Sequence, residues 1–353
     1  MLESMQETHT TFGINGFGRI GRTAFRVWWL FHRDEMTLRV INTSGSMDIE
    51  DWAHLIKYDS NYGPFAESIT VQRQRSRKEV SDENPVLGTL TIGGKEIIVT
   101  AQRDPAKIPW GSQGVSVVIE STGAFTDSEK AKAHLAGGAQ KVIISAPATG
   151  DVETSVIGVK DPTQTLHIIS NASCTTNCVA PVAAVIQQVF GIEKAMMTTV
   201  HSYTDDQNLH DNSHKDMRRA RAAGMNIVPT STGAAKAVGL VVPELQGIFD
   251  GLAIRVPTAT GSISDFVFIL KRDTTKEEVN AALVAASQDP RWAGILSVTA
   301  DPIVSSDIKG RRESSIVDLS LTNVVAGNMV KVVSWYDNEF GYCNRLVEQI
   351  ARV

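Results

Sequence analysis

The chain has 353 residues, of which 42% are hydrophobic and 21% are charged, and its formal net charge is −5. This length exceeds that of a usual single domain, so we expect two domains, each with its own core. The acidic balance argues against nucleic acid as the main partner. No apolar run reaches the roughly 20 residues that a membrane-spanning helix needs, so we expect no membrane partner.

The N-terminus and the cysteines bear on the compartment. The opening residues MLESMQETHT hold two glutamates and no apolar core, unlike a secretory signal or an Arg-rich transit peptide. We interpret them as a short polar leader and expect a cytoplasmic protein. The three cysteines, Cys174, Cys178 and Cys343, are too few for a disulfide framework and include no zinc-type CxxC pair. We therefore expect reduced thiols and no metal site.

The first part of the chain alternates β-branched runs with helical stretches. A helix from Arg19 to about Arg33 lies between strands at Thr10–Asn15 and Leu38–Asn42, which is the pattern of a βαβ unit. Continuous Val and Ile content predicts further strands, buried on both faces, at Glu96–Thr100, Val115–Glu120 and Lys141–Ser145. We expect an α/β Rossmann-type dinucleotide-binding domain over residues 1–173.

The strands become longer and alternate more after residue 173. They are expected at Leu252–Pro257, Ser262–Lys271 and Asn328–Tyr336, with a helix near Thr275–Ser287. This pattern predicts an α+β catalytic domain with a mainly antiparallel sheet over residues 174–337. A final helical segment, 338–353, is expected to pack back on the first domain.

A glycine-rich loop follows the first strand. Gly16, Gly18 and Gly21 have the spacing G-x-G-x-x-G and open the first helix, where glycines permit a tight turn and close approach of a pyrophosphate. An NAD site of this type expects an acidic residue at the end of the second strand, about 20 residues on. Here that strand ends in Asn42, Thr43 and Ser44, and no carboxylate is present.

Cys174 lies in the run SNASCTTN (170–177), just before the apolar helical run Val179–Phe190. A helix N-terminus favours the thiolate, which suits a nucleophile. Pro181 leaves two possible helix starts, one near Thr175 and one nearer Ala180. Cys178, one turn further on, is expected to pack inward without a chemical role.

His201 ends a predicted strand in the run TTVHSYT (198–204). An imidazole at such a strand end can project into a cleft and take the proton of a thiol. The sequence alone does not bring His201 to Cys174, so a structural histidine remains the alternative interpretation.

Six motifs in order along nearly the whole chain resemble the glyceraldehyde-3-phosphate dehydrogenase family. They are GINGFGRIGR (13–22), ESTGAF (120–125), SNASCTTNC (170–178), TTVHSYT (198–204), STGAAKA (231–237) and SWYDNEFGY (334–342). The resemblance implies oxidative phosphorylation of glyceraldehyde 3-phosphate, in the glycolytic or the biosynthetic direction. A thiolate attacks the aldehyde, a hydride passes to a nicotinamide, and inorganic phosphate cleaves the thioester.

The resemblance also implies roles for individual residues. Cys174 is the nucleophile, and His201 is the base and stabilises the oxyanion. Thr204 and Arg255 are implied in binding the substrate phosphate. The residues implied in binding inorganic phosphate are Ser173, Thr175, Arg219, Thr232 and Gly233. For Arg219 and its neighbours Arg218 and Arg221, a solvated charge run or an interface remains the alternative. The residues implied in binding the coenzyme are Gly16, Gly18, Arg19, Ile20, Gly21, Asn42, Thr43, Ser44, Ser145, Asn338 and Ser213.

The coenzyme is expected to be NADP or NAD, with use of both possible. Relatives with Asn-Asp at the end of the second strand repel a 2′-phosphate, whereas Thr43 and Ser44 remove that charge and offer hydroxyl donors. Ser213 stands where NADP-using relatives carry serine. Thr43 holding an unphosphorylated ribose is the alternative.

The resemblance further implies a homotetramer, with Tyr203 to about Ile227 packed against a neighbour's coenzyme. An erythrose 4-phosphate dehydrogenase, a thiol hydrolase and a non-catalytic binding protein on the same fold remain as rival functions.

Overall fold

The computed structural model describes residues 9–163 and 165–353, so most of the expected polar leader lies outside the described residues. The chain divides into two compact units. Unit 1 takes the described residues of Met1–Glu153, Pro162–Asn171 and Leu346–Val353, and unit 2 takes Thr154–Asp161 and Ala172–Arg345.

These bounds differ from those expected at residues 173 and 338. Thr154–Asp161 belongs to unit 2 because Val156 and Ile157 are buried in the same hydrophobic cluster as Val179. The final segment is divided, and only its part from Leu346 onward belongs to unit 1.

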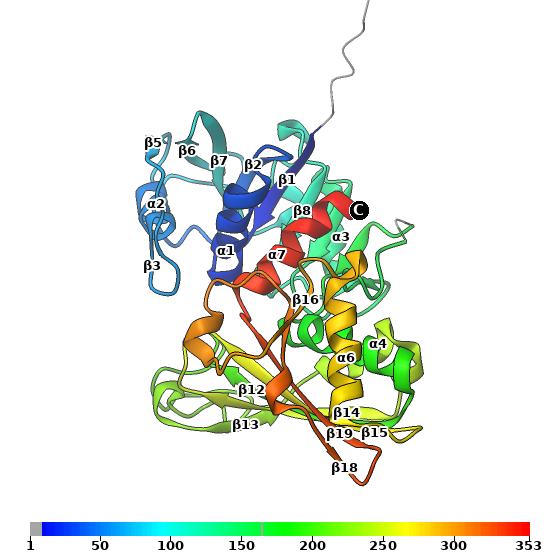
Figure 1. Cartoon of the computed structure of the whole chain (residues 1–353). Coiled ribbons are helices and arrows are strands. Elements are labelled where there is room, and N and C mark those ends of the chain that lie inside the picture. Colours follow the sequence, from blue (N-terminus) through cyan, green and yellow to red (C-terminus); the bar gives the residue numbers. More distant parts are fainter. Residues whose placement is uncertain (1–8, 164) are drawn as a thin grey trace, which may run out of the picture. The chain divides into compact units, whose positions relative to one another are not determined.

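Unit 1 is built on a nine-stranded sheet with the order β10-β11-β9-β8-β1-β2-β7-β6-β5 (Figure 1). Parallel pairing joins β1 to β2 and β8, β2 to β7, and β9 to β8 and β11, as a Rossmann-type domain requires. The strands are β1 Thr10–Asn15, β2 Met36–Thr43, β5 Ile69–Arg73, β6 Val86–Ile92, β7 Lys95–Ala101, β8 Val117–Glu120, β9 Lys141–Ile144, β10 Glu153–Thr154 and β11 Ile168–Ser170. The antiparallel strands β5 and β6 at one edge were not expected from the sequence.

The helices of unit 1 are α1 Arg19–Val27, α2 Ile49–Lys57 and α3 Ser128–Ala136. The helix expected to reach Arg33 leaves α-helical geometry after Val27 and continues as a π-helical turn over Trp28–His32. The two tryptophans of this turn are buried, and Trp28 donates from Nε1 to the carbonyl of Met36 at 3.0 Å. Packing of these bulky rings therefore accompanies the wider turn.

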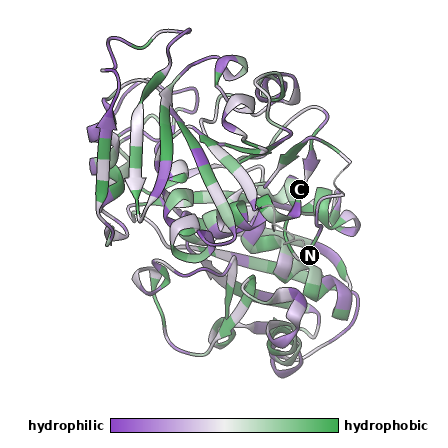
Figure 2. Cartoon of the chain, turned by 90° about the horizontal axis from the view of Figure 1, so that it is seen from above, coloured by the Kyte–Doolittle hydropathy of each residue, from purple (hydrophilic) through white to green (hydrophobic). Residues whose placement is uncertain are grey.

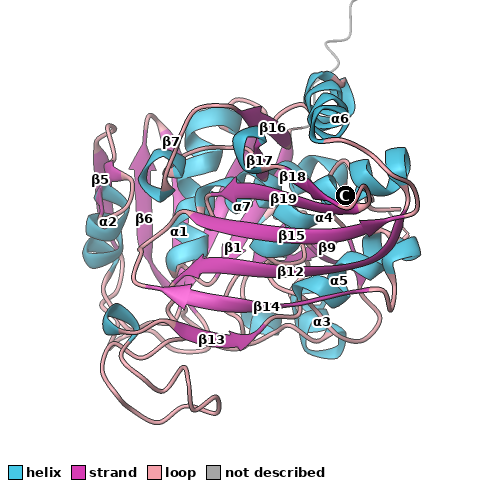
Figure 3. Cartoon of the chain, turned by 60° about the horizontal axis from the view of Figure 1, so that its bottom comes forward, coloured by secondary structure: helices cyan, strands magenta, loops and turns pink. Residues whose placement is uncertain are grey.

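Unit 2 is built on an eight-stranded, mainly antiparallel sheet (Figure 3). Its path is β13-β14-β12-β15-β19-β17-β16, and β18 pairs with β19. The strands are β12 Ile192–Ser202, β13 Val228–Ser231, β14 Phe249–Val256, β15 Ser262–Leu270, β16 Leu296–Thr299, β17 Ser315–Asp318, β18 Asn323–Val325 and β19 Met329–Tyr336. Only β12 with β14 and β16 with β17 run parallel within this sheet. The predicted α+β class is confirmed.

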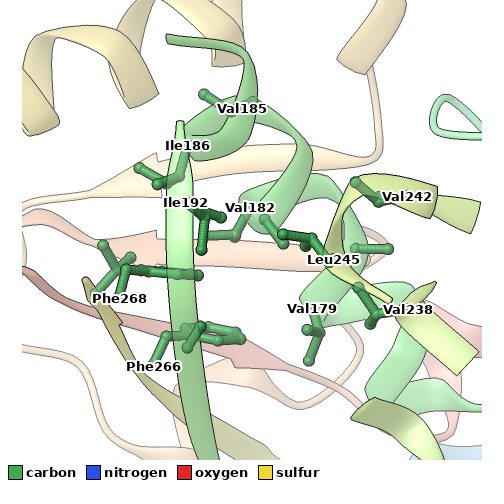
Figure 4. Close-up of a cluster of buried hydrophobic side chains, with 14 of the residues drawn as sticks. Val179, Val182, Val185, Ile186, Ile192, Val238, Val242, Leu245, Phe266 and Phe268 are labelled. Atoms are coloured by element: carbon green, nitrogen blue, oxygen red, sulfur yellow. The ribbon is translucent and has the colours of Figure 1, made fainter. Parts of the chain in front are cut away.

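The α-helices described in the C-terminal half are α4 Cys174–Phe190, α5 Ala234–Val241, α6 Lys276–Gln288 and α7 Phe340–Glu348. The apolar face of α4 packs on the sheet, where Val179, Val182 and Ile186 meet Phe266 and Phe268 of β15 (Figure 4). This buried cluster fixes the position of α4 and hence of the residue at its N-terminus.

Hydrophobic residues concentrate in the strands and helices, and hydrophilic residues are frequent in the outer loops (Figure 2). Among the described residues, no helix combines the length and the apolar character needed to cross a membrane.

Candidate active site

Cys174 is the first residue of α4, which settles the two helix starts in favour of the earlier one. Ser173 caps this helix, because its Oγ accepts from the backbone N–H of Thr176 at 3.0 Å. Pro181 lies inside α4, where it removes one backbone hydrogen bond without ending the helix. The position at the helix N-terminus, through the helix dipole, favours negative charge on the Cys174 sulfur.

His201 is brought to Cys174 by the neighbouring strand β12. Its Nε2 lies 3.4 Å from Cys174 Sγ, within hydrogen-bonding distance for sulfur. Its Nδ1 lies 2.6 Å from the carbonyl oxygen of Ser202, which can only accept a hydrogen bond. Nδ1 therefore carries the ring proton, and Nε2 presents its lone pair to the thiol.

Burial keeps both partners uncharged before reaction. Desolvation, followed by the charge of Arg255, lowers the pKa of His201 to about 3. Burial also raises the pKa of the Cys174 thiol, while Arg255 and hydrogen bonds from Thr175 oppose that rise. The pair is thus a thiol facing a neutral base, with a guanidinium nearby that favours the thiolate once the proton moves.

A second group of charges surrounds Arg255 of β14, which pairs in register with His201 on the adjacent parallel strand. Arg255 Nη1 donates to Thr204 Oγ1 at 2.5 Å, and Thr204 in turn donates to Asp206. Arg219 donates to the other oxygen of Asp206 at 2.6 Å. Burial raises the pKa of Asp206, but contacts with Thr204, Arg255 and Arg219 outweigh burial and hold that pKa below its ordinary value.

These contacts connect Arg255 and Arg219 through Thr204 and Asp206. The resemblance assigns Arg255 to the substrate phosphate and Arg219 to inorganic phosphate. Arg255 Nε is buried and has no hydrogen-bond partner among the described residues, so it remains available to an anionic ligand. Of the three clustered arginines, Arg219 enters the network, whereas Arg221 pairs with Asp211 at 2.8 Å and Arg218 is exposed.

Other expected phosphate ligands use their side chains locally. Thr232 Oγ1 accepts from the backbone N–H of Ala234 at 3.2 Å, and Gly233 caps α5. A Cβ built on Gly233 would meet nothing within 4 Å, so the start of α5 is open to an anion. The hydroxyls of Ser173 and Thr175 are already bonded to Thr176 and Tyr336.

Tyr336 is a site residue that the sequence did not reveal. Its buried hydroxyl lies 3.0 Å from Thr175 Oγ1 and 2.8 Å from Thr199 Oγ1, and its ring packs edge-on against His201. It therefore holds the imidazole and the first turn of α4 in place. The motif SWYDNEFGY contains it, but only the pairing of β19 with β15 brings it to this site.

The two remaining expected coenzyme residues of unit 2 lie in different settings. Asn338 is buried, and its Oδ1 accepts from Ser262 Oγ at 2.8 Å, which leaves its amide nitrogen as the donor. Ser213 lies in an exposed loop, where its backbone N–H donates to Asn212 and its carbonyl accepts from Asn208.

The glycine loop of unit 1 forms one wall of a pocket. The pocket is lined by Asn15, Gly16, Phe17, Gly18, Asn42, Thr43, Ser44, Trp52, Gln102, Arg103, Ser121, Thr122, Ala124 and Phe125. A Cβ on Gly21 would lie 2.1 Å from the Gly16 carbonyl oxygen, whereas a Cβ on Gly18 would stand in open space. Gly21 thus permits close packing and Gly18 faces open space, whereas the expected binding of a pyrophosphate there stays a prediction. Ile20 lies in the first turn of α1, and the Arg19 side chain pairs with Asp59 at 2.6 Å.

Thr43, Ser44 and Arg103 also line this pocket. Arg103 was missed because it lies 60 residues beyond Thr43 and approaches it only through the pairing of β2 with β7. Thr43 Oγ1 donates to the carbonyl of Thr100 at 3.0 Å, so the expectation that this hydroxyl donates to a 2′-phosphate is not supported.

A buried hydrogen-bond network supports the pocket floor. Glu120, at the end of β8, accepts from Asn15 Nδ2 at 2.5 Å and from the backbone N–H of Thr122 at 2.7 Å. It also lies 2.9 Å from His134 Nε2, and His134 Nδ1 accepts from Trp110 at 3.2 Å. An indole N–H only donates, so His134 Nδ1 is the acceptor and the ring proton lies on Nε2. Nε2–H therefore donates a hydrogen bond to the Glu120 carboxylate. Ser145 follows β9 and donates its backbone N–H to the Glu120 carbonyl at 2.9 Å.

Both parts of the chain match known protein families. A family model described as "Glyceraldehyde 3-phosphate dehydrogenase, NAD binding domain" matches residues 10–128, and one described as "Glyceraldehyde 3-phosphate dehydrogenase, C-terminal domain" matches residues 173–338.

Curated relatives match over nearly their whole length. The chain is 51% identical to "Glyceraldehyde-3-phosphate dehydrogenase 1" of Streptomyces avermitilis and 52% identical to "Glyceraldehyde-3-phosphate dehydrogenase" of Streptomyces coelicolor, each over 95% of this chain and 96% of the relative. It is 50% identical to "Glyceraldehyde-3-phosphate dehydrogenase" of Geobacillus stearothermophilus over 97% of both chains. The chain belongs to the glyceraldehyde 3-phosphate dehydrogenase family.

Proposed function

We propose that this chain is a phosphorylating glyceraldehyde-3-phosphate dehydrogenase that uses NADP or NAD. The observation that carries the proposal is the 3.4 Å approach of Cys174 Sγ to the unprotonated nitrogen of His201, beside Arg255. A nucleophile, a base with a fixed tautomer and a cation for an anionic substrate are thereby assembled in one unit.

Cys174 starts the reaction in this proposal. Its proton passes to His201 Nε2, and the sulfur adds to the aldehyde carbon to give a hemithioacetal. His201 returns that proton to the oxyanion formed by the addition, which gives the hydroxyl. It then takes the hydroxyl proton back as the carbon loses a hydride, which leaves a thioester on Cys174. The nicotinamide of the bound coenzyme supplies the hydride acceptor. Inorganic phosphate attacks the thioester carbonyl, the C–S bond breaks, and an acyl phosphate leaves with the thiolate restored.

Two sets of residues suit the two phosphates. Arg255 and Thr204 present a guanidinium and a hydroxyl to the substrate phosphate, and the unpartnered Nε of Arg255 adds a second donor. Arg219 and the open start of α5 at Thr232 and Gly233 suit inorganic phosphate. The backbone N–H groups at Cys174 and Thr175, in the first turn of α4, suit the same anion.

The adenosine end of the pocket favours NADP, alone or together with NAD. No carboxylate stands where Thr43 ends β2, and Arg103 lines the same part of the pocket as Ser44. An arginine in this place accommodates a 2′-phosphate.

The test is steady-state oxidation of glyceraldehyde 3-phosphate with phosphate and each coenzyme, with erythrose 4-phosphate as the rival substrate. Turnover is expected with glyceraldehyde 3-phosphate and lost in Cys174→Ala, which should still bind coenzyme because the pocket lies in unit 1. Undiminished turnover in Cys174→Ala, or a preference for erythrose 4-phosphate, would contradict the proposal.

Thr43→Asp tests the coenzyme assignment. The new carboxylate is expected to repel a 2′-phosphate and to accept from the ribose hydroxyls of NAD, so the ratio of kcat/KM for NADP over NAD should fall by about 10-fold or more. Thr43→Ser is the control and should keep the ratio. The interpretation of β2 fails if the wild type ignores NADP or if Thr43→Asp leaves the ratio unchanged.

The remaining parts of the proposal concern assembly and compartment. Large apolar side chains in the segment Tyr203–Ile227 are exposed in the single chain, notably Leu209, Met217, Met225 and Ile227. They support a homotetramer in which this segment packs against a neighbour, because patches of this kind mark interfaces. The three cysteines form no disulfide in the described part of the chain, which suits a cytoplasmic enzyme.

A further inference from the structure

The loop between β5 and β6 brings one of its basic residues, Arg77, to the turn that follows β2. This loop covers residues 74–85 and includes Arg75, Arg77 and Lys78. The backbone N–H of Arg77 donates to Asp48 Oδ1 at 2.5 Å, and its guanidinium donates to the carbonyl oxygen of Ser46. The Arg77 backbone is therefore anchored while its side chain stays exposed.

Ser46 links Arg77 to the pocket wall. Ser44, which lines the pocket, donates from Oγ to Ser46 Oγ at 2.9 Å. Arg103 lines the same pocket, so two guanidinium groups approach the turn that follows β2 from different elements. A strictly NAD-binding site carries a carboxylate at the end of β2, directly before that turn.

The acidic residues near Arg77 are already engaged. Asp48 accepts from the Arg77 backbone, and Asp51 accepts from the Asp48 backbone at 3.1 Å in the cap of α2. Glu50 pairs with Arg73 at 2.8 Å. Among residues 9–163 and 165–353, Arg77 forms no ion pair, and its only side-chain partner is the neutral carbonyl of Ser46.

We propose that Arg77 is a specificity-determining residue that, together with Arg103, binds the 2′-phosphate of NADP. A phosphate dianion accepts charge-assisted hydrogen bonds that are stronger than the bond to a neutral carbonyl, so the guanidinium exchanges Ser46 for the phosphate. NAD offers no such group, and Arg77 then keeps its contact with Ser46. This inference rests on the proposed use of NADP.

Direct binding of adenosine nucleotides tests the role of Arg77 without catalysis. The probes are adenosine 2′,5′-bisphosphate and adenosine 5′-monophosphate, titrated by calorimetry into the wild-type chain, Arg77→Gln and Arg75→Gln. Arg75 is the matched control, because it lies in the same loop and donates to Asn84 Oδ1 at 3.2 Å.

Arg77→Gln is expected to weaken binding of the bisphosphate by about 10-fold and to leave the monophosphate unchanged. In turnover assays the KM for NADP should rise by a similar factor, while kcat and the KM for NAD stay as in the wild type. Arg75→Gln should behave as the wild type in every assay.

The outcomes separate the two proposals. If the wild type prefers the bisphosphate and Arg77→Gln keeps that preference, or if Arg77→Gln weakens both probes equally, the role of Arg77 is overturned and NADP use stands. If the wild type binds the two probes equally well, NADP use itself is overturned, and the role of Arg77 falls with it. Oxidation of glyceraldehyde 3-phosphate with NAD remains a separate test of the enzyme.

Discussion

The imidazole of His201 owes its reactivity to a main-chain atom. The Ser202 carbonyl holds the proton on Nδ1, and burial with the nearby Arg255 charge keeps Nε2 unprotonated down to a pH of about 3. Across the physiological range the ring is therefore neutral, and its Nε2 lone pair faces the Cys174 thiol. Its role does not depend on a carboxylate partner, unlike the histidine of a Ser-His-Asp triad.

His201→Asn is expected to slow hydride transfer by about 10²–10⁴-fold, because a positioned base contributes that much. The Cys174 thiol should also react more slowly with iodoacetamide at neutral pH. Single-turnover reduction of the coenzyme and the alkylation rate measure the two effects separately.

His54→Asn is the matched control, since His54 is exposed on α2 in unit 1. It should keep wild-type rates in both assays. Unchanged alkylation and unchanged single-turnover rates in His201→Asn would show that another group takes the thiol proton.

At the level of elements, different glycines of the loop between β1 and α1 serve packing and ligand access. The Gly16 backbone has a φ of 91° and comes close to Thr122, and a Cβ on Gly21 would collide with the Gly16 carbonyl. Gly18 caps α1 with an ordinary negative φ and faces open space. Two glycines of the motif therefore shape the turn, and the third leaves room for the ligand.

Gly21→Ala is expected to lower the free energy of unfolding by about 1–3 kcal/mol, because the new methyl group must displace the Gly16 backbone. Gly18→Ala should cost less stability, about 0.5–1 kcal/mol, because alanine is a poorer N-cap than glycine, yet it should weaken coenzyme binding because its methyl group narrows the pocket. Urea denaturation and coenzyme titration measure the two properties. Equal loss of stability in both variants would refute this division of roles.

The sequence predicted most elements because their signals are local. Hydrophobic runs predicted β1, β8, β9 and α6 to within about two residues, and the glycine spacing placed the turn before α1. The π-helical turn at Trp28 and the edge strands β5 and β6 depend on packing and sheet pairing, which leave no periodic signature.

The candidate site shows the same limit. Cys174 and His201 were recognisable one by one, but their approach depends on how α4 packs on the sheet. Arg103 and Tyr336 lie in strand-end and loop positions whose neighbours come from distant strands. Their roles follow from strand register, which a single sequence does not encode locally.

At the scale of the whole molecule, buried titratable groups tie the stability of the fold to pH. Burial raises the pKa of Cys178 to about 12 and raises the pKa of Tyr336 still more strongly. Such groups stabilise the fold fully below their unfolded pKa and lose that contribution as the pH rises towards the folded value. His201 acts at the other end, because its lowered pKa makes the fold less stable as the pH falls below about 6.5 towards 3.

Cys178→Ala is expected to flatten the alkaline side of this stability profile. Between pH 8 and pH 10 the wild type should lose about 1–2 kcal/mol more than the variant, because only the wild type ionises a thiol at this position on unfolding. Denaturation with urea at both pH values gives the difference. A parallel loss in the two proteins would mean that Cys178 does not contribute to the alkaline limb.

The division into units also bears on how the chain folds during synthesis. Unit 1 contains β1 and also Leu346–Val353, which follow unit 2 in the chain, whereas every residue of unit 2 has been made once Arg345 is added. Domains commonly fold in the order in which they leave the ribosome. Here the order is expected to be reversed, since unit 1 begins first but is completed only after all of unit 2 has been made. A chain ending at Arg345 should therefore resist proteases in unit 2 and remain cleavable in unit 1.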